Sequence, residues 1–534
     1  MPVLAGWLTG EQVPQEAIEQ TLTAMGGVLA SHGGEPASTI QPGAGLIAFS
    51  DTAYTMQQKE PAVLDWVPDR RTLVYRRPLS GLHPLYYVEN WPAEGNLLFA
   101  SEIKALLAVG VPRRLHIAAL TALVQYGSIP APWTAFKDIH VVPAGSILRW
   151  QHTKVVLNHA SDFVLETPDS PGTNFEKLDG LLSQTTRDLL PSHEQLVALV
   201  NGDRASLLVA ALASQYKQTA VPLATLGHDQ PLNDRAWQNI QAVTDKYSSP
   251  LLAITGVDQP EYWQATLLGL ESPCCDSRGL AIHQLLHTSS METGARVALS
   301  ALGAQTLMGL TSKRLPASMN NTTDLLAAQR QLTQPLLMQQ LEEIWSPAAH
   351  QLLQSSESWE DTLHARKLQR HAQQYTDHNL GMHYLDLHIN LADRLVQPFY
   401  QLALQEQMII RSPYLQPAVM ETLISLAQPL AQDLNYRKSM VKMIKRHIPR
   451  LSNVPAALPL LLPTPSLQIS RHKENELLQQ VLSPAAIQKL DLFNFTNIQA
   501  LQPRAAGDWI TDQALIFVFT TQLFCVLFGI EEWA

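Results

Sequence analysis

Short apolar segments that alternate with helical segments constrain the fold of this chain more than any other feature. The segment Leu196–Val200 (LVALV) is typical of a buried strand, a glycine-containing turn follows it, and a helix is predicted over Ser206–Ser214. Two further strand-like segments occupy Ala220–His228 and Leu251–Val257. Strands that alternate with helices in this order predict a parallel sheet in an α/β domain.

A different pattern precedes this region. Residues 1–160 contain short apolar runs broken by glycine and proline, which predict β-strands with helices over Gln15–Ser31 and Glu102–Val109. Residues 161–174 are polar and rich in Asp, Ser and Pro, and we interpret them as a linker. Residues 1–160 are therefore predicted to form a separate N-terminal domain.

The remainder, residues 175–534, is interpreted as the second domain. Its parallel sheet is expected over about 190–315, and the Gln-rich and Leu-rich part from about 323–534 is expected to be helical. A chain of 534 residues is long enough for both domains to have their own cores.

Charge and cysteine content restrict the possible partners and the compartment. The formal net charge is −10, and the most basic segment, Arg437–Arg450, is interrupted by apolar residues typical of one amphipathic helix. Nucleic acid would be repelled by this field, so no nucleic-acid partner is expected. The three cysteines, Cys274, Cys275 and Cys525, form neither a disulfide framework nor a metal motif, which favours a cytoplasmic location.

The apolar segment Ala514–Ile530 is the membrane candidate of the sequence. It is shorter than the roughly 20 residues of a spanning helix and a Thr-Thr-Gln triplet interrupts it, so no transmembrane segment is predicted. We interpret it as a buried terminal helix capped by Thr511 or Asp512. A helix that docks on a partner and a contact with a membrane are the alternatives.

Two motifs connect the chain to a known family. The segment that starts at Arg77 reads RPLSGLHPLYYVENWPAEGNLLFASEIKALL, and the segment that starts at Gly127 reads GSIPAPWTAFKDIHVVPAGSILRW. They resemble the R-D-x-x-G-x-x-P-L-Y-Y, F-A-S-E-I-K-A-L and P-x-T-x-F-x-x-I-x-x-L-P-x-G motifs of class B, glutamine-dependent asparagine synthetases. The resemblance implies a truncated Ntn-hydrolase-like αββα sandwich, followed by an α/β domain like the ATP pyrophosphatases (adenine nucleotide α-hydrolase-like) with a large helical part.

The glutaminase residues of that family are altered in this chain. The family uses an exposed Cys at residue 2 as the nucleophile, and an Asp in R-D-x-x-G holds the ammonium group of glutamine. Pro2 stands at the first position, Arg77-Pro78 stands at the second, and no N-G-E triplet lies between Ala44 and Arg76. The sequence therefore predicts a domain without glutaminase activity.

The pyrophosphate loop of the family, S-G-G-x-D-S-S, is altered as well. The matching segment NGDRASL keeps Gly202 and Ser206, while Ala205 replaces the metal-binding Asp. Asp203 replaces the second glycine and would repel a pyrophosphate unless Arg204 or a metal neutralises it. The predicted remnant of the ATP loop comprises Asn201, Gly202, Asp203, Arg204 and Ser206.

A second acidic motif of the family, S-G-D-G-A-D-E-L-F-G-G, corresponds to SALGAQTLMG. Ser300 and Gly303 remain, whereas Leu302, Gln305 and Thr306 replace the carboxylates. Residues that shape the turn are kept and those that bind Mg²⁺ are lost. A third segment, ESPCCD, resembles the family's D-E-P-x-x-D and leaves Glu271 and Asp276 as secondary catalytic candidates.

Histidines provide no metal motif in the sequence. His364, His371 and His378 recur every seven residues on a predicted helix. Seven residues are about two turns, so successive histidines lie about 10 Å apart, too far to share an ion. His383 and His388 are five residues apart and do not share a helical face. No metal site is predicted.

The leading hypothesis is a non-catalytic relative that acts by binding a protein partner. That partner is either an active paralogue or a second copy of this chain, in an amide-forming or peptide or natural-product modification system. The loss of the glutaminase nucleophile resembles the situation in β-lactam synthetases and lasso-peptide cyclases, which keep the synthetase half. The alternative is an ATP-dependent amide ligase or cyclase with a rebuilt site that includes Asp203, Arg204, Glu271 and Asp276. No cofactor is expected under the first hypothesis, and ATP with Mg²⁺ is expected under the second.

Overall fold

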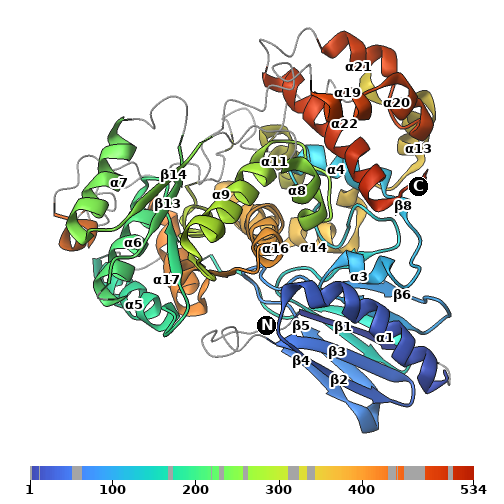
Figure 1. Cartoon of the computed structure of the whole chain (residues 1–534), viewed down its shortest axis with the longest axis horizontal. Coiled ribbons are helices and arrows are strands. Elements are labelled where there is room, and N and C mark those ends of the chain that lie inside the picture. Colours follow the sequence, from blue (N-terminus) through green and yellow to red (C-terminus); the bar gives the residue numbers. More distant parts are fainter. Residues whose placement is uncertain are drawn as a thin grey trace.

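The computed structural model describes residues 3–10, 13–50, 63–165, 172–217, 219–227, 234–255, 262–310, 315, 324–333, 343–430, 441, 443–449, 475–502 and 509–534. Pro2, His228, residues 256–257, part of the predicted linker and part of Arg437–Arg450 lie outside these residues. Figure 1 shows the N-terminal sheets at one end of the molecule and the parallel-sheet domain and the C-terminal helices above them.

The N-terminal domain is built on two antiparallel sheets. The six-stranded sheet has the order β2-β3-β1-β7-β6-β9 and the four-stranded sheet has the order β11-β10-β5-β4. The first contains β1 (Val3–Leu8), β2 (Glu35–Gln41), β3 (Ala44–Ser50), β6 (Tyr86–Glu89), β7 (Leu97–Ala100) and β9 (His140–Val141). The second contains β4 (Val63–Val67), β5 (Thr72–Arg76), β10 (Ser146–Gln151) and β11 (Lys154–His159).

Alternation along strand β1 explains why the two sheets stack. Leu4 and Leu8 pack with Leu73, Leu148 and Trp150 of the other sheet, because side chains two residues apart share a face. The remaining β1 side chains join the core on the opposite face, where helices α1 (Gln15–Leu29) and α3 (Ile103–Leu107) lie. Both helices were predicted to within a few residues.

The outer face of the four-stranded sheet is partly open to solvent. Val67 and Val156 expose 41% and 47% of their surface there. An αββα sandwich would carry its second helical layer on this face. Within the described residues α1 and α3 both belong to the other layer, so this part of the predicted truncated sandwich has the form αββ.

The second domain contains the predicted parallel sheet. Its order is β14-β13-β12-β15-β16, and all of its pairings are parallel. The strands are β12 (Leu196–Leu199), β13 (Leu223–Leu226), β14 (Leu251–Ile254), β15 (Val297–Leu299) and β16 (Ile409–Arg411). The expectation that residues 323–534 are entirely helical is wrong, because β16 comes from that part and pairs with β15 at the sheet edge.

Helices surround this sheet and form the C-terminal part of the molecule. Those nearest the sheet in sequence are α5 (Gly172–Leu189), α6 (Arg204–Lys217), α7 (Asp234–Tyr247), α8 (Tyr262–Leu270), α9 (Arg278–Thr293) and α10 (Ala304–Leu307). The next are α11 (Leu325–Thr333), α13 (Pro347–Ser355), α14 (Leu363–Ala372), α15 (His378–Asp386), a π-helix (Leu387–Val396), α16 (Gln397–Gln405) and α17 (Pro417–Leu430). The last are α19 (Glu476–Val481), α20 (Pro484–Leu490), α21 (Phe495–Leu501) and α22 (Trp509–Phe528).

Helix α4 (Ile117–Tyr126) was not predicted. Eight of its ten residues are buried, so it has no polar face and no amphipathic period to recognise. It ends at Gly127, whose φ of 76° is the left-handed conformation that favours glycine.

The apolar C-terminal segment forms helix α22, and 83% of its window Thr511–Phe528 is buried inside the protein. By length and composition this window could cross a membrane. It packs against α8, and the Thr520 hydroxyl donates a hydrogen bond to the Cys274 carbonyl at 2.7 Å. A buried terminal helix is thus confirmed, but the predicted cap is wrong: the helix begins at Trp509, so Thr511 and Asp512 lie in its first turn.

The chain end returns to the N-terminal domain. Strand β17 (Glu532–Trp533) pairs in parallel with β8 (Arg114–Leu115), and the Ala534 amide donates to the Leu115 carbonyl at 2.9 Å. This pairing joins the C-terminal helices to the segment that precedes α4.

Candidate functional site

The predicted nucleotide loop lies between the central strand β12 and helix α6. Asn201, Gly202 and Asp203 form the turn, Arg204 is the first residue of α6, and Ser206 is in its first turn. All are buried except Arg204, which is half-buried. Backbone N–H groups at the start of a helix bind anions, so this is the position where a pyrophosphate would bind.

The Asp203 carboxylate occupies that helix terminus. One of its oxygens accepts a hydrogen bond from the Ser206 amide at 2.7 Å, as a helix-capping Asp does, and the other accepts from the Gln305 side chain at 2.6 Å. Asn201 completes the cluster: its side-chain oxygen accepts from the Ser206 hydroxyl at 2.7 Å and from the Asp203 amide at 3.1 Å. The Ser206 amide, an N–H group that could hold a phosphate, therefore donates its hydrogen bond to the carboxylate of Asp203 instead.

Burial also affects the protonation of this group. Asp203 is 2% exposed, and burial raises its pKa although the hydrogen bonds from Ser206, Gln305 and Asn201 act in the opposite direction. A second anion at the same place would add repulsion to a carboxyl group that already lacks solvation.

The structure brings the two predicted motifs together at this point. Gln305, in α10, bonds Asp203, and the Ser300 hydroxyl accepts a backbone N–H two residues further on at 2.9 Å. Gly303 has a φ of 87°, and a Cβ atom there would lie 2.6 Å from the Leu415 side chain. An amide therefore stands where the family resemblance implies a metal-binding carboxylate.

Gly202 is required by the backbone whether or not a nucleotide binds. Its φ is 82°, and a Cβ atom would lie 2.7 Å from the Ala236 methyl group and 2.8 Å from its carbonyl oxygen. Ala236 belongs to α7, so this glycine allows α7 to pack against the loop.

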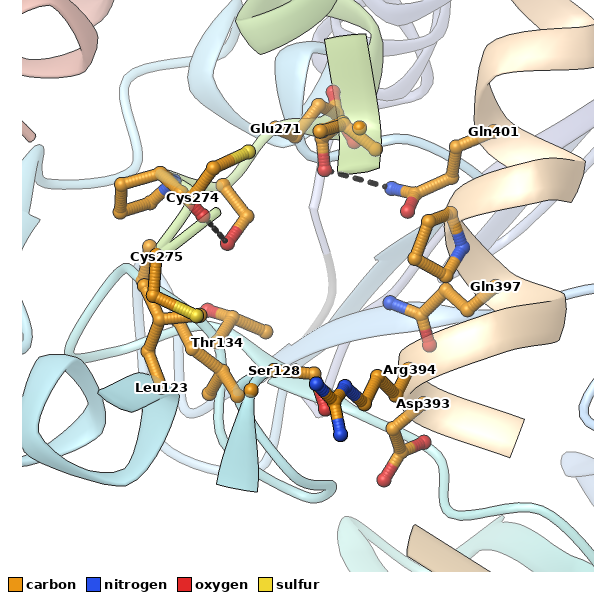
Figure 2. A pocket seen from close by; sticks show the side chains of 18 of the residues that line it. Leu123, Ser128, Thr134, Glu271, Cys274, Cys275, Asp393, Arg394, Gln397 and Gln401 are labelled. Carbon is orange, nitrogen blue, oxygen red and sulfur yellow. Dashed lines mark hydrogen bonds between the residues drawn. The ribbon is translucent and has the colours of Figure 1, made fainter. Parts of the chain in front are cut away.

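A pocket between the two domains contains the other candidate residues. It holds about 720 Å³ of empty space, counted together with open solvent at its mouth. Figure 2 shows Asp393, Arg394, Gln397 and Gln401 along one side, with Cys274, Cys275 and Thr134 across the space. Ser128, Glu271, Asp276 and Arg278 also line it.

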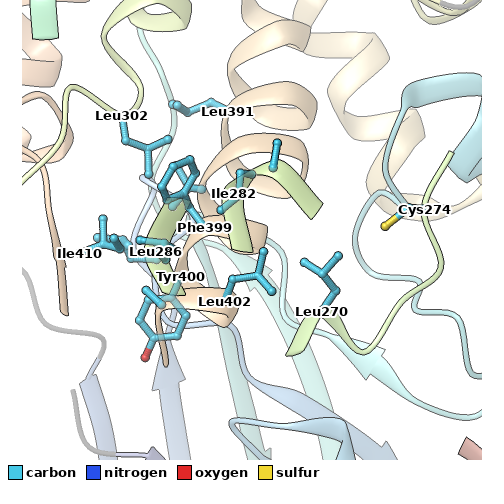
Figure 3. Close-up of a cluster of buried hydrophobic side chains, with 14 of the residues drawn as sticks. Leu270, Cys274, Ile282, Leu286, Leu302, Leu391, Phe399, Tyr400, Leu402 and Ile410 are labelled. Atoms are coloured by element: carbon cyan, nitrogen blue, oxygen red, sulfur yellow. The ribbon is translucent and has the colours of Figure 1, made fainter. Parts of the chain in front are cut away.

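A buried apolar cluster supports the wall of this pocket (Figure 3). Leu270 and Ile282 line the pocket and join a core that includes Leu286, Phe399 and Leu402, which are 0% to 1% exposed. Close packing of this kind holds the polar side chains on α9 and α16 in place.

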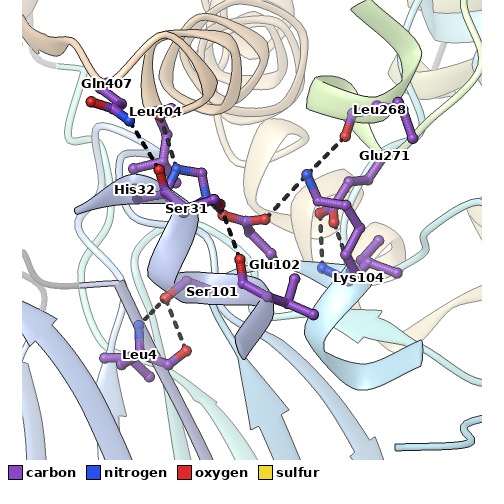
Figure 4. A network of polar contacts seen from close by, with 12 residues as sticks. Leu4, Ser31, His32, Ser101, Glu102, Lys104, Leu268, Glu271, Leu404 and Gln407 are labelled. Carbon is purple, nitrogen blue, oxygen red and sulfur yellow. Dashed lines mark hydrogen bonds and ion pairs between the residues drawn. The ribbon is translucent and has the colours of Figure 1, made fainter. Parts of the chain in front are cut away.

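Glu271 connects the domains. Its carboxylate oxygens accept hydrogen bonds from the backbone amides of Ile103 at 2.8 Å and Lys104 at 2.7 Å, at the start of α3 (Figure 4). Glu271 ends α8 with a φ of 52°, a left-handed conformation in which glycine is usual. Burial raises its pKa to about 7, against the effect of nearby Lys104. The secondary catalytic candidate is thus engaged in a contact between domains.

Asp276 forms the charged centre of the pocket. It pairs with Arg278, and Arg394 lies 4.0 Å from the same carboxylate oxygen. Burial alone would raise the pKa of Asp276, but the two guanidinium groups outweigh it and lower the pKa. Two arginines thus flank this carboxylate, while the carboxyl groups of Glu271 and Asp393 line the same pocket.

Asp393 is the third carboxyl group that lines this pocket, and its environment differs from that of Asp276. One oxygen accepts from the Ala131 amide at 2.9 Å, and burial raises its pKa to about 6 despite the charge of Arg77. Arg77 itself donates to the Val142 carbonyl at 2.7 Å and to Gln397 at 3.0 Å, so it links the domains.

The predicted site residues fall into two places. Glu271 and Asp276 line the pocket, whereas Asp203 and Arg204 do not. Arg278 was not identified from the sequence, and its only signal was its position two residues after Asp276. Asp393 and Arg394 were not among the site residues predicted from the sequence.

Two family models match this architecture. A glutamine amidotransferase domain model matches residues 62–160, and an asparagine synthase model matches residues 177–519, more than half of the 534 residues. A search of curated proteins finds none that matches this chain.

This architecture joins a domain of two antiparallel sheets to a domain with a parallel sheet, and the two models identify them as a glutamine amidotransferase domain and an asparagine synthase domain. The chain belongs to the asparagine synthase family. It has asparagine synthetase-like amidotransferase and synthetase domains.

Proposed function

We propose that this protein is a non-catalytic member of its family and acts as a scaffold or regulatory subunit. The observation that carries the proposal is the Asp203 carboxylate at the start of α6, bonded to Ser206 and Gln305. A nucleotide would have to displace this buried cluster before its phosphates could reach the helix N-terminus. The replaced carboxylates at Ala205 and Gln305 leave fewer ligands for Mg²⁺.

The N-terminal domain supports the same proposal. Arg77 uses its guanidinium group for contacts with Val142 and Gln397, and Pro78 cannot hold an ammonium group. The sequence at residue 2 offers no thiol. The domain then serves to complete the interface with the synthetase-like domain rather than to release ammonia.

The protein is proposed to work in the cytoplasm with an active paralogue or a second copy of itself, in an amide-forming or peptide or natural-product modification system. Within the family, we propose that the protein belongs to the branch that contains β-lactam synthetases and lasso-peptide cyclases. No cofactor is needed for this role.

An amide ligase with a rebuilt site is the second candidate, and the interdomain pocket favours it. Arg278 and Arg394 beside Asp276 could hold a carboxylate substrate. The ATP and Mg²⁺ that such a reaction needs would have to bind at Asp203 and Arg204, outside the lining of this pocket.

Calorimetry with ATP and Mg²⁺, combined with a pyrophosphate-release assay over a set of carboxylic acids, separates the two. The proposal predicts no binding at micromolar concentrations and no pyrophosphate. Micromolar binding together with pyrophosphate release for any acid would establish the ligase instead. If neither is seen, co-purification with the paralogue from the native host identifies the partner.

A further inference from the structure

Four polar side chains surround Asp162 where the linker meets the helical part of the second domain. Asp162, in the linker, lies 3.2 Å from His159 Nε2 and 2.9 Å from His388 Nε2. His371 Nδ1 is 2.9 Å from the same carboxylate, and the Tyr384 hydroxyl donates to it at 3.0 Å. This cluster is separate from both the nucleotide loop and the interdomain pocket.

We propose that His159, Asp162 and His388 bind a divalent transition-metal ion, for which Zn²⁺ is the natural choice. Two imidazoles and one carboxylate form a ligand set that proteins use for zinc. Their ligand atoms all lie within 4.8 Å of one another. Two ligands of a tetrahedral zinc ion, each about 2.0–2.1 Å from the metal, are roughly 3.3 Å apart. The observed separations of 2.9 and 3.2 Å need only small adjustment.

The nitrogen of His159 points to the same conclusion. Within the described residues, His159 Nε2 is buried, and its polar contact is the ion pair with Asp162 at 3.2 Å, which lacks the geometry of a regular hydrogen bond. A metal ion between His159 Nε2 and the Asp162 carboxylate would bind both through their lone pairs and replace this long contact. The ring centres of His159 and His388 are 5.8 Å apart, close enough for both to reach one ion.

His371 and Tyr384 form a second layer of side chains, which would contact the ligand Asp162 rather than the metal ion. Each bonds the Asp162 carboxylate, which is how ligating carboxylates are oriented in metal sites. The exposed fractions of the Asp162 and His371 side chains, 25% and 42%, leave a path for an ion from solvent. His388 lies in the π-helix, an irregularity that is often found at functional sites.

A second cluster serves as the comparison. His283 and His287, four residues apart on α9, each bond a different oxygen of Glu406 at 2.9 Å, and the other His283 nitrogen bonds Thr266. Every one of these nitrogens and oxygens has a partner. In the first cluster His388 Nε2 also bonds Asp162 at 2.9 Å, so the difference between the clusters lies in His159 Nε2, which has no regular hydrogen bond.

Titration of the metal-free full chain with Co²⁺ tests the proposal. We expect visible absorption of a tetrahedral cobalt complex that saturates near one equivalent, competition by Zn²⁺, and a higher midpoint of thermal unfolding with Zn²⁺ than with chelator. His159→Gln should remove the absorption, and His371→Gln should weaken Co²⁺ binding about tenfold because it affects only the second layer.

Two control variants and a folding check distinguish metal binding at this cluster from binding at another histidine and from misfolding. His350→Gln, at an exposed residue of α13, and His287→Gln should both bind Co²⁺ as the unchanged chain does. Circular dichroism and the unfolding midpoint of the metal-free His159→Gln variant should match the unchanged chain, which excludes misfolding. No cobalt spectrum in the unchanged chain, or a spectrum that His159→Gln leaves intact or His287→Gln removes, would overturn the proposal.

Discussion

The nucleotide loop and the interdomain pocket contain the same kinds of side chains in opposite arrangements. In the loop, Asn201, Asp203, Ser206 and Gln305 bond one another and close the space at the start of α6. In the pocket, charged groups such as Arg394 border empty space. The loop is therefore packed closed between strand and helix, whereas the side chains between the domains border open space.

The difference also shows why loss of motif residues need not disturb a fold. Gly202, Ser300 and Gly303 remain because backbone geometry and packing require them, independently of any nucleotide. At the positions where the resemblance implies carboxylates, Ala205, Leu302 and Thr306 are buried and Gln305 bonds Asp203.

The largest expected change in the free energy of unfolding comes from a substitution in the nucleotide loop. Gly202→Ala forces a left-handed conformation on alanine and places its methyl group against Ala236, at an expected cost of about 4 kcal/mol in the free energy of unfolding. Gly180→Ala, in α5 with no atom within 4 Å of the added Cβ, should instead stabilise by up to about 1 kcal/mol. Urea unfolding of the two variants measures these changes in stability. Equal changes in the two variants would show that the loop is not tightly packed against α7.

The next largest expected change in stability comes from Asp393 in the interdomain pocket, and it depends on pH. Asp393 has a pKa of about 6 in the folded protein against an ordinary value of 3.8, because it is buried. As pH rises from about 4 to about 6 the unfolded chain loses this proton first, so stability is lost over that window, by at most about 3 kcal/mol. Asp393→Asn should remove this loss. Parallel stability curves for the two proteins between about pH 4 and about pH 6.5 would contradict the assignment.

A smaller effect is expected at the contact between domains. Glu271→Ala leaves the Ile103 and Lys104 amides without their acceptor and should destabilise by about 2 kcal/mol. Glu271→Gln keeps one acceptor oxygen and should lose about half as much. If both variants unfold as the unchanged chain does, Glu271 is not a structural contact and its catalytic candidacy returns.

Much of the architecture could be predicted from local patterns. The alternation of LVALV, a glycine turn and a helix indicated the first strands of the parallel sheet, because buried strands read as continuous apolar runs. Strand β16 was missed because three residues, Ile409–Arg411, carry too little pattern and pair with a strand more than a hundred positions away. Helix α4 was missed because it is buried on nearly all sides.

The sites were harder to predict than the fold for a related reason. The Asp203 loop could be identified because its residues are contiguous. Asp162, His159 and His388 come together only through tertiary packing, so the spacing of histidines along one helix could not indicate their cluster. Arg278 and Arg394 likewise meet at Asp276 from different helices.

The affinity of the loop for magnesium pyrophosphate tests the central claim most directly. Calorimetry on the unchanged chain should show no binding at micromolar concentrations, whereas Asp203→Gly, which frees the Ser206 amide, should bind at least about tenfold more tightly, or about 1.4 kcal/mol. Asp245→Asn, which removes one exposed negative charge from α7, is the matched control and should behave as the unchanged chain. Micromolar binding by the unchanged chain that Asp203→Gly weakens would contradict the claim that Asp203 closes the nucleotide site.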